Sequence, residues 1–69
     1  MNKIDTIHRI VDLIQRGEEN PSLDWLNTDY EEAINLAIQL DEAGLLLEKD
    51  ASFFVDQCNI IRVQVFDDL

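Results

Sequence analysis

The longest apolar pattern in the chain lies between Thr28 and Gly44. Placed at 100° per residue, its apolar side chains cover about 220° of a helix surface, far more than the ~100° stripe of a surface helix. They are Tyr30, Ala33, Ile34, Leu36, Ala37, Ile38, Leu40 and Ala43. The pattern predicts a helix over about 28–43 that other elements cover on more than one side. Thr28 and Glu31 have the spacing of a capping box, and Gly44 is typical of a helix end.

The segment 3–16 predicts a second, amphipathic helix. Its apolar residues Ile4, Ile7, Ile10, Val11 and Ile14 gather on one side. Asn2 is suited to cap its start, and Gly17 is expected to end it. Pro21 then favours a short turn or helix between the two main helices. Within that connection Trp25 is expected to anchor the core, with an exposed binding contact as the alternative.

After Gly44 the apolar period changes from 3.6 to 2. Ile61, Val63 and Val65 alternate with Arg62 and Gln64, which is typical of a strand with one buried face. The sequence therefore predicts an α+β fold in a single domain, 1–69. Its two main helices are joined by the short connection, and a small antiparallel β-sheet follows over about 45–66.

This order of elements resembles the winged helix-turn-helix family. The resemblance rests on Leu36, Leu40 and the run Gly44-Leu45-Leu46, which matches the end of that family's third helix. It implies a winged-helix-like fold and DNA binding through the third helix. Here, however, the matching helix carries no Lys or Arg, and its acidic side chains oppose binding to phosphates.

Charge is concentrated in the middle of the chain. The protein has 15 acidic and 5 basic residues, a formal net charge of −10. Residues 17–48 hold nine of the acids and no base. Such a field repels nucleic acid and attracts basic proteins, although it also simply improves solubility.

Candidate chemistry is sparse. One His, one Cys and two Ser residues do not supply the nucleophile, base and orienting group that covalent catalysis needs. The run Asn27-x-Asp29-x-Glu31 resembles the start of a calcium loop, but it lacks the glycine and the bidentate glutamate that complete one. We expect no enzyme activity, no cofactor and no bound metal.

The function predicted from these observations is a small acidic interaction module that binds a basic surface of a protein partner. A regulator or inhibitor of the nucleic-acid-mimic (DNA mimic) type fits this description. The expected protein-binding residues are Glu31, Glu32, Asn35, Gln39, Glu42 and Trp25. The alternative is a winged-helix DNA-binding transcriptional regulator that acts as a dimer. It would assemble its basic surface from Lys3, Arg9, Arg16, Lys49 and Arg62.

The length of the chain and its lack of targeting signals predict its oligomeric state and its compartment. A chain of 69 residues builds a small core, so we expect a homodimer or a protein that needs a partner. The single cysteine, the lack of a signal peptide and the lack of an apolar run of about 18 residues predict a cytoplasmic protein with no membrane contact.

Overall fold

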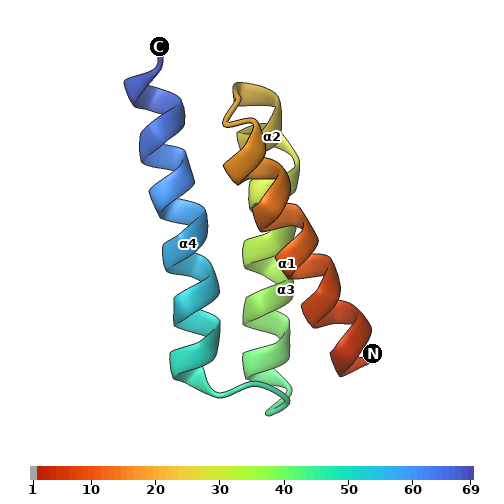
Figure 1. Cartoon of the computed structure of the whole chain (residues 1–69). Coiled ribbons are helices and arrows are strands. Elements are labelled where there is room, and N and C mark those ends of the chain that lie inside the picture. The colour runs from red at the N-terminus through yellow and green to blue at the C-terminus, as the bar shows by residue number, and fades with distance from the viewer. Residues whose placement is uncertain (1) are drawn as a thin grey trace.

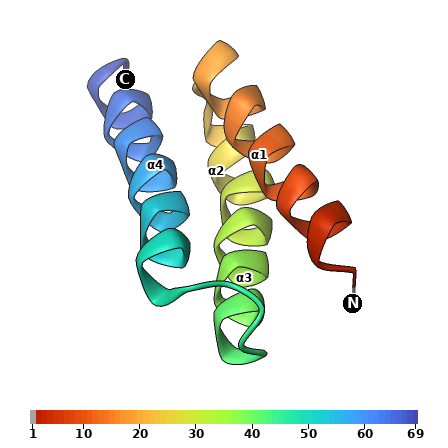
Figure 2. The same ribbon diagram turned by 60° about the horizontal axis from the view of Figure 1, so that its bottom comes forward.

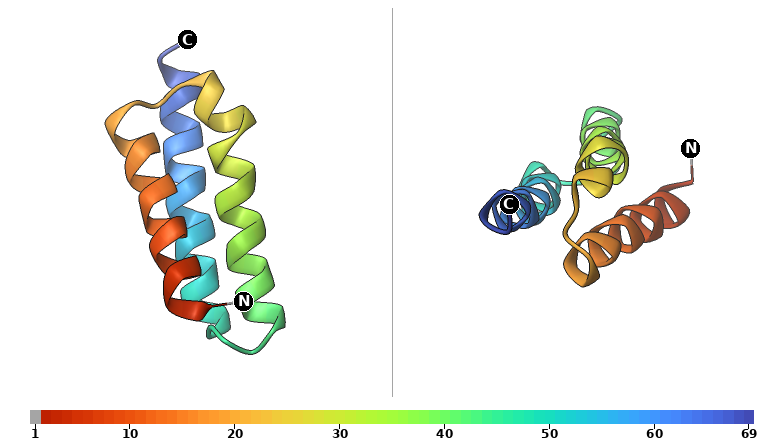
Figure 3. Two further views of the ribbon diagram at one scale, coloured as in Figure 1. Left: turned by 90° about the vertical axis from the view of Figure 1, so that its right-hand side faces the viewer. Right: turned by 90° about the horizontal axis from the view of Figure 1, so that it is seen from above.

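The computed structural model describes residues 2–69, and within them the chain forms four helices (Figure 1). They are α1 (Lys3–Glu19), α2 (Leu23–Asn27), α3 (Asp29–Glu42) and α4 (Glu48–Asp67). α3 packs against both α1 and α4, which touch each other less extensively. α1 and α4 run in the same direction and α3 runs in the opposite one (Figures 1 and 3). The three long helices therefore form a triangle in end view, and α2 lies at the end where α3 begins.

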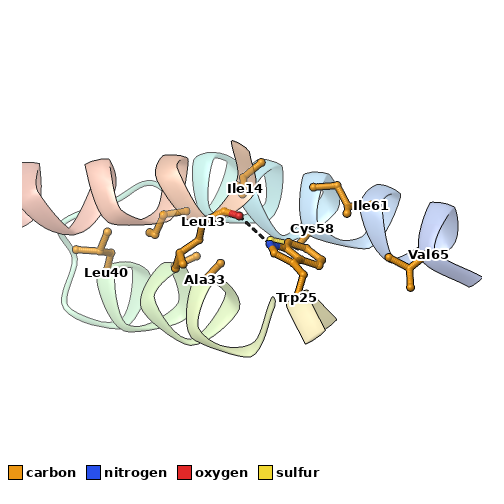
Figure 4. Packing of buried hydrophobic residues seen from close by; sticks show 10 residues of the cluster. Leu13, Ile14, Trp25, Ala33, Leu40, Cys58, Ile61 and Val65 are labelled. Atoms are coloured by element: carbon orange, nitrogen blue, oxygen red, sulfur yellow. Dashed lines mark hydrogen bonds between the residues drawn. The ribbon is translucent and has the colours of Figure 1, made fainter. Parts of the chain in front are cut away.

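The core lies between the three long helices and contains one large aromatic ring (Figure 4). Its buried residues are Ile10, Leu13, Ile14, Trp25, Ala33, Ala37, Leu40, Cys58, Ile61 and Val65. α3 contributes Ala33 and Ala37 at its centre, and these small side chains allow the two neighbouring helices to approach its backbone. Cover on two sides explains most of the wide apolar arc in the sequence, whereas Ile38, at its edge, is 44% exposed.

Trp25 joins α2 to α1. Its side chain is 4% exposed, and the indole Nε1 donates a hydrogen bond of 2.8 Å to the carbonyl oxygen of Leu13 (Figure 4). The ring lies against Gly17, where an added Cβ would overlap the indole. Burial thus confirms the core position expected for Trp25. It also explains the glycine in the last turn of α1, a helix that continues to Glu19 instead of ending at residue 16.

The prediction of an antiparallel sheet over 45–66 is wrong. Residues 2–69 contain no strand, and residues 48–67 form α4. The fold is therefore all-α and not winged-helix-like. Ala51, Cys58, Ile61 and Val65 recur at helical spacing and face the core. Other apolar residues of α4 face outward, and this second apolar side hid the period of 3.6 in the sequence.

The helix ends confirm two expectations and correct a third. The Asn2 side chain accepts from the Asp5 N–H at 3.2 Å and caps α1, as predicted. Gly44 has φ +71°, and this left-handed residue turns the chain after α3, also as predicted. Thr28, however, makes no side-chain capping bond to α3. Its Oγ1 donates to the carbonyl oxygen of Asp24 at 2.8 Å, so α2 and α3 follow each other almost without a loop.

Figure 2 shows the connection from α3 to α4, which crosses the end of the bundle opposite α2. It spans residues 43–47 and begins with a backbone hydrogen bond of 2.9 Å from Leu45 N to Leu40 O. Leu46 packs against the core from this loop. The run Gly44-Leu45-Leu46 is therefore a helix end followed by a packed loop, and no strand follows it.

The contact between Gly17 and Trp25 leads to the first prediction. Replacing glycine by alanine inside an exposed helix stabilises it by about 1 kcal/mol. Gly17→Ala should instead destabilise the protein by about 1–3 kcal/mol, because the methyl group displaces the indole from its site. Urea unfolding followed by circular dichroism measures this difference.

The matched control is the same substitution in a Trp25→Leu background. With the indole removed, Gly17→Ala should be neutral or stabilising, since only the helix propensity remains. An equal loss of stability in both backgrounds would contradict the packing described for Gly17.

Candidate interaction surfaces

One side of α3 presents an exposed polar face, as predicted. Glu31, Asn35, Gln39 and Glu42 are all exposed. Their spacing of three or four residues places them on neighbouring turns of one helix side. Neither carboxylate takes part in an ion pair among residues 2–69. We call these four residues the acidic face; they bring two free carboxylates and two amides together.

Glu32 does not belong to this face. Its carboxylate turns toward α1 and binds the Arg9 guanidinium through two bonds, Nε to Oε2 at 2.7 Å and Nη2 to Oε1 at 3.1 Å. This hydrogen bonding lowers the pKa of the Glu32 carboxyl and raises the pKa of Arg9. Glu32 is one of the expected protein-binding residues, but its partner lies 23 residues away in sequence, beyond the reach of spacing along one helix. Its carboxylate therefore contributes to the contact between α1 and α3.

Three of the five cations named for the DNA-binding alternative contact other side chains of the bundle. Arg9 is paired with Glu32, and Arg16 lies 3.2 Å from Asp12 and 3.9 Å from Asp29. Both arginines of α1 are thus engaged by carboxylates of α1 and α3. Arg62 lies on another helix, with its guanidinium carbon 5.6 Å from the centre of the Phe66 ring.

Trp25 is also absent from the exposed surface. Its ring meets Tyr30 edge to face with 5.7 Å between centroids. The Tyr30 hydroxyl in turn donates to Asn59 Oδ1 on α4 at 2.7 Å. Through this network the buried Trp25 ring contributes to the stability of the bundle and not to an exposed binding contact.

The outer side of α4 carries large exposed apolar side chains that the period-2 pattern in the sequence does not predict. Phe53, Ile60, Val63 and Phe66 are each more than half exposed, at 58%, 52%, 58% and 53%. The sequence predicts strands here, and strands do not place these four side chains on one helix. Phe53, Ile60 and Val63 follow one another at intervals of seven and three residues, which places them on one side of the helix.

A shallow groove separates α1 from α4. Its volume is about 210 Å³. It is lined by Val11, Ile14, Gln15, Glu18, Phe53, Phe54 and Gln57. The groove exists because α1 and α4 each pack mainly on α3, and it extends the apolar surface of α4 toward α1.

Cys58 is fully buried beside the core residues of α1 and α3. Burial raises the pKa of its thiol to about 11, which leaves it protonated and unreactive at neutral pH. In residues 2–69 no three His, Cys, Asp or Glu side chains are grouped as metal ligands would be. None of the helices described has the length and apolar content needed to cross a membrane.

In comparisons with known proteins, no protein family, no curated protein and no solved structure matches this chain. Its functional surfaces must therefore be judged from their own chemistry.

The buried thiol gives a pH-dependent prediction. The neutral thiol is favoured in the folded state, so the stability it contributes is present below pH 9.0 and is lost as the pH rises toward about 11. Over this window the free energy of unfolding should fall by up to about 1.4 kcal/mol per pH unit relative to Cys58→Ala. Urea unfolding of both proteins across the window measures the difference, and parallel curves would contradict it.

Proposed function

We propose that the protein is a non-enzymatic interaction module that binds a basic surface of another protein through the acidic face of α3. The observation that supports this most is the separation of charges. Glu31 and Glu42 remain free at the surface, whereas the arginines of α1 are held by Asp12, Asp29 and Glu32. Because both arginines of α1 are paired with carboxylates, neither presents an unpaired positive charge that would repel a basic partner.

Long-range electrostatics favour the same class of partner. With a net charge of −10 the protein attracts cationic surfaces over about 8 Å at physiological salt. Complementary charge of this kind mainly raises the association rate, and added salt lowers it steeply. The same field repels the phosphates of nucleic acid.

The composition of the acidic face favours discrete polar contacts over imitation of a phosphate chain. Its two carboxylates are 11 positions apart, or about 16 Å along the helix, with Asn35 and Gln39 between them. Carboxylates accept hydrogen bonds from Arg and Lys, whereas amides both donate and accept. We therefore infer a partner that presents Lys or Arg at both ends of its contact and neutral polar groups in the middle.

Charge reversal on the acidic face tests this proposal. The double variant Glu31→Lys/Glu42→Lys leaves the core and the Arg9–Glu32 pair untouched, so it should fold. Basic proteins captured from a lysate of the native host by the wild-type chain should be lost or weakened by about tenfold or more. The captured proteins are identified by mass spectrometry, and each is then measured by titration at ~0.15 M and ~0.5 M NaCl.

The matched control is Glu19→Lys/Asp68→Lys, which changes net charge equally at exposed positions outside the acidic face. This variant should keep most of the affinity. Equal losses in both double variants would mean that only net charge matters, and the acidic face would not be a specific site.

DNA binding separates the proposal from its alternative. The unmodified chain should not bind double-stranded DNA at ~150 mM salt, because α3 offers no cation to release counterions from phosphates. Fluorescence anisotropy with labelled duplexes of random sequence measures this. Tight, sequence-specific binding would overturn the proposal.

A further inference from the structure

The outer side of α4 carries a stripe with the spacing of a coiled coil. Its residues are Lys49, Phe53, Asp56, Ile60, Val63 and Asp67. They follow one another at intervals of 4, 3, 4, 3 and 4 residues, which is the a/d spacing of a heptad repeat. All six are exposed, and they lie on the side of α4 away from the core residues Cys58, Ile61 and Val65. We call them the outer stripe.

The outer stripe is symmetric about Cys58. Lys49 and Asp67 are each nine residues from it, Phe53 and Val63 are each five, and Asp56 and Ile60 are each two. Two copies of α4 packed antiparallel around a two-fold axis at this level bring the two members of every pair face to face. In an antiparallel coiled coil an a position packs against a d position, and each of these pairs contains one of each.

We propose that the outer stripe is a homodimerisation surface on which two copies of α4 pack antiparallel, with the two-fold axis at the level of residue 58 along the helix. Phe53 packs on Val63 of the partner subunit, and Lys49 pairs with Asp67 of the partner subunit. Two-fold symmetry repeats each contact, so both ends of the interface carry an ion pair and the apolar contacts lie between them.

The charges at the ends of α4 support a second copy as the occupant. Lys49 lies in the first turn of the helix and Asp67 in its last turn, and both signs are unfavourable against the dipole of their own helix. Neither residue has an ion-pair partner within residues 2–69. An antiparallel copy supplies the opposite charge at both ends, and it orients the two helix dipoles in opposite directions, which is favourable. A parallel copy would place Lys49 on Lys49 and Asp67 on Asp67.

Asp56 limits the strength of this contact. It faces Ile60 of the partner subunit near the two-fold axis, so two carboxylates approach each other in the middle of an apolar stripe. Charges that leave water without a counterion are unfavourable. With a stripe of only about 27 Å, the dimer should be weak, with a dissociation constant in the micromolar range.

The dimer leaves the acidic face free. Glu31 and Glu42 lie on α3, outside the outer stripe. Association would thus yield a bivalent acidic protein, and it does not depend on the function proposed above. Glu31→Lys/Glu42→Lys should dimerise like the wild type, which keeps the two proposals separately testable.

Sedimentation equilibrium of the purified full chain, from about 5 µM to about 1 mM, tests the interface and its orientation. The wild type should show a monomer–dimer equilibrium. Asp56→Leu should tighten it by about tenfold or more, because an apolar side chain replaces the central charge. Lys49→Glu and Asp67→Lys should each weaken it by about tenfold, since each places two like charges together.

The decisive variant is the charge swap Lys49→Glu/Asp67→Lys. It restores opposite charges only in the antiparallel arrangement, so its dissociation constant should return to within about threefold of the wild type. Arg62→Glu, an exposed change on α4 outside the stripe, is the matched control and should have little effect. Circular dichroism establishes that every variant remains helical.

Three outcomes would overturn the proposal. One is an Asp56→Leu protein that remains monomeric at about 1 mM. Another is a dimer that ignores all the stripe substitutions, which would place the interface elsewhere. The third is a charge swap that weakens the dimer as much as the two single changes combined, which would exclude the antiparallel order.

Discussion

The buried indole of Trp25 is the contact on which the arrangement of the helices depends. It bonds to the Leu13 carbonyl of α1 and meets Tyr30 at the start of α3. Tyr30 continues the network to Asn59 of α4 through its hydroxyl. One polar and aromatic chain therefore links all four helices. Leaving the indole N–H buried without a partner would cost about 1–3 kcal/mol, so this network selects one packing of helices from many.

A second constraint comes from the chain's few cations. Arg9 and Arg16 of α1 pair with Glu32 and Asp29 of α3, and Arg16 also pairs with Asp12 within α1. These pairs are exposed, and exposed pairs contribute little to stability. Their larger consequence is for the surface, because they remove two cations and one of the predicted site residues from it. The remaining acidic face is smaller than the acidic run in the sequence, and more clearly defined.

α4 has two apolar sides, one packed in the core and one exposed as the proposed dimer surface. Ala51, Cys58, Ile61 and Val65 pack against the bundle, while Phe53, Ile60 and Val63 face outward with Lys49 and Asp67 at the ends. Small proteins gain stability when association covers such a surface. The outer stripe and the acidic face lie on different helices, so association through one leaves the other free for a partner.

The local sequence determined the first and third helices, their caps and the exposed side of α3, because these features depend on residues a few positions apart. The helical character of 3–16 and 28–43, the Asn2 cap, the glycine end at Gly44 and the exposure of Glu31, Asn35, Gln39 and Glu42 all follow from spacing within a few turns. Long-range contacts decided the rest. Gly17 continues its helix because Trp25 packs on it, and Glu32 leaves the acidic face because Arg9 lies on the adjacent helix. Residues 48–67, rich in Val, Ile and Phe, form a helix because one of their two apolar sides is buried against α1 and α3, and β-propensity is too weak to oppose that burial.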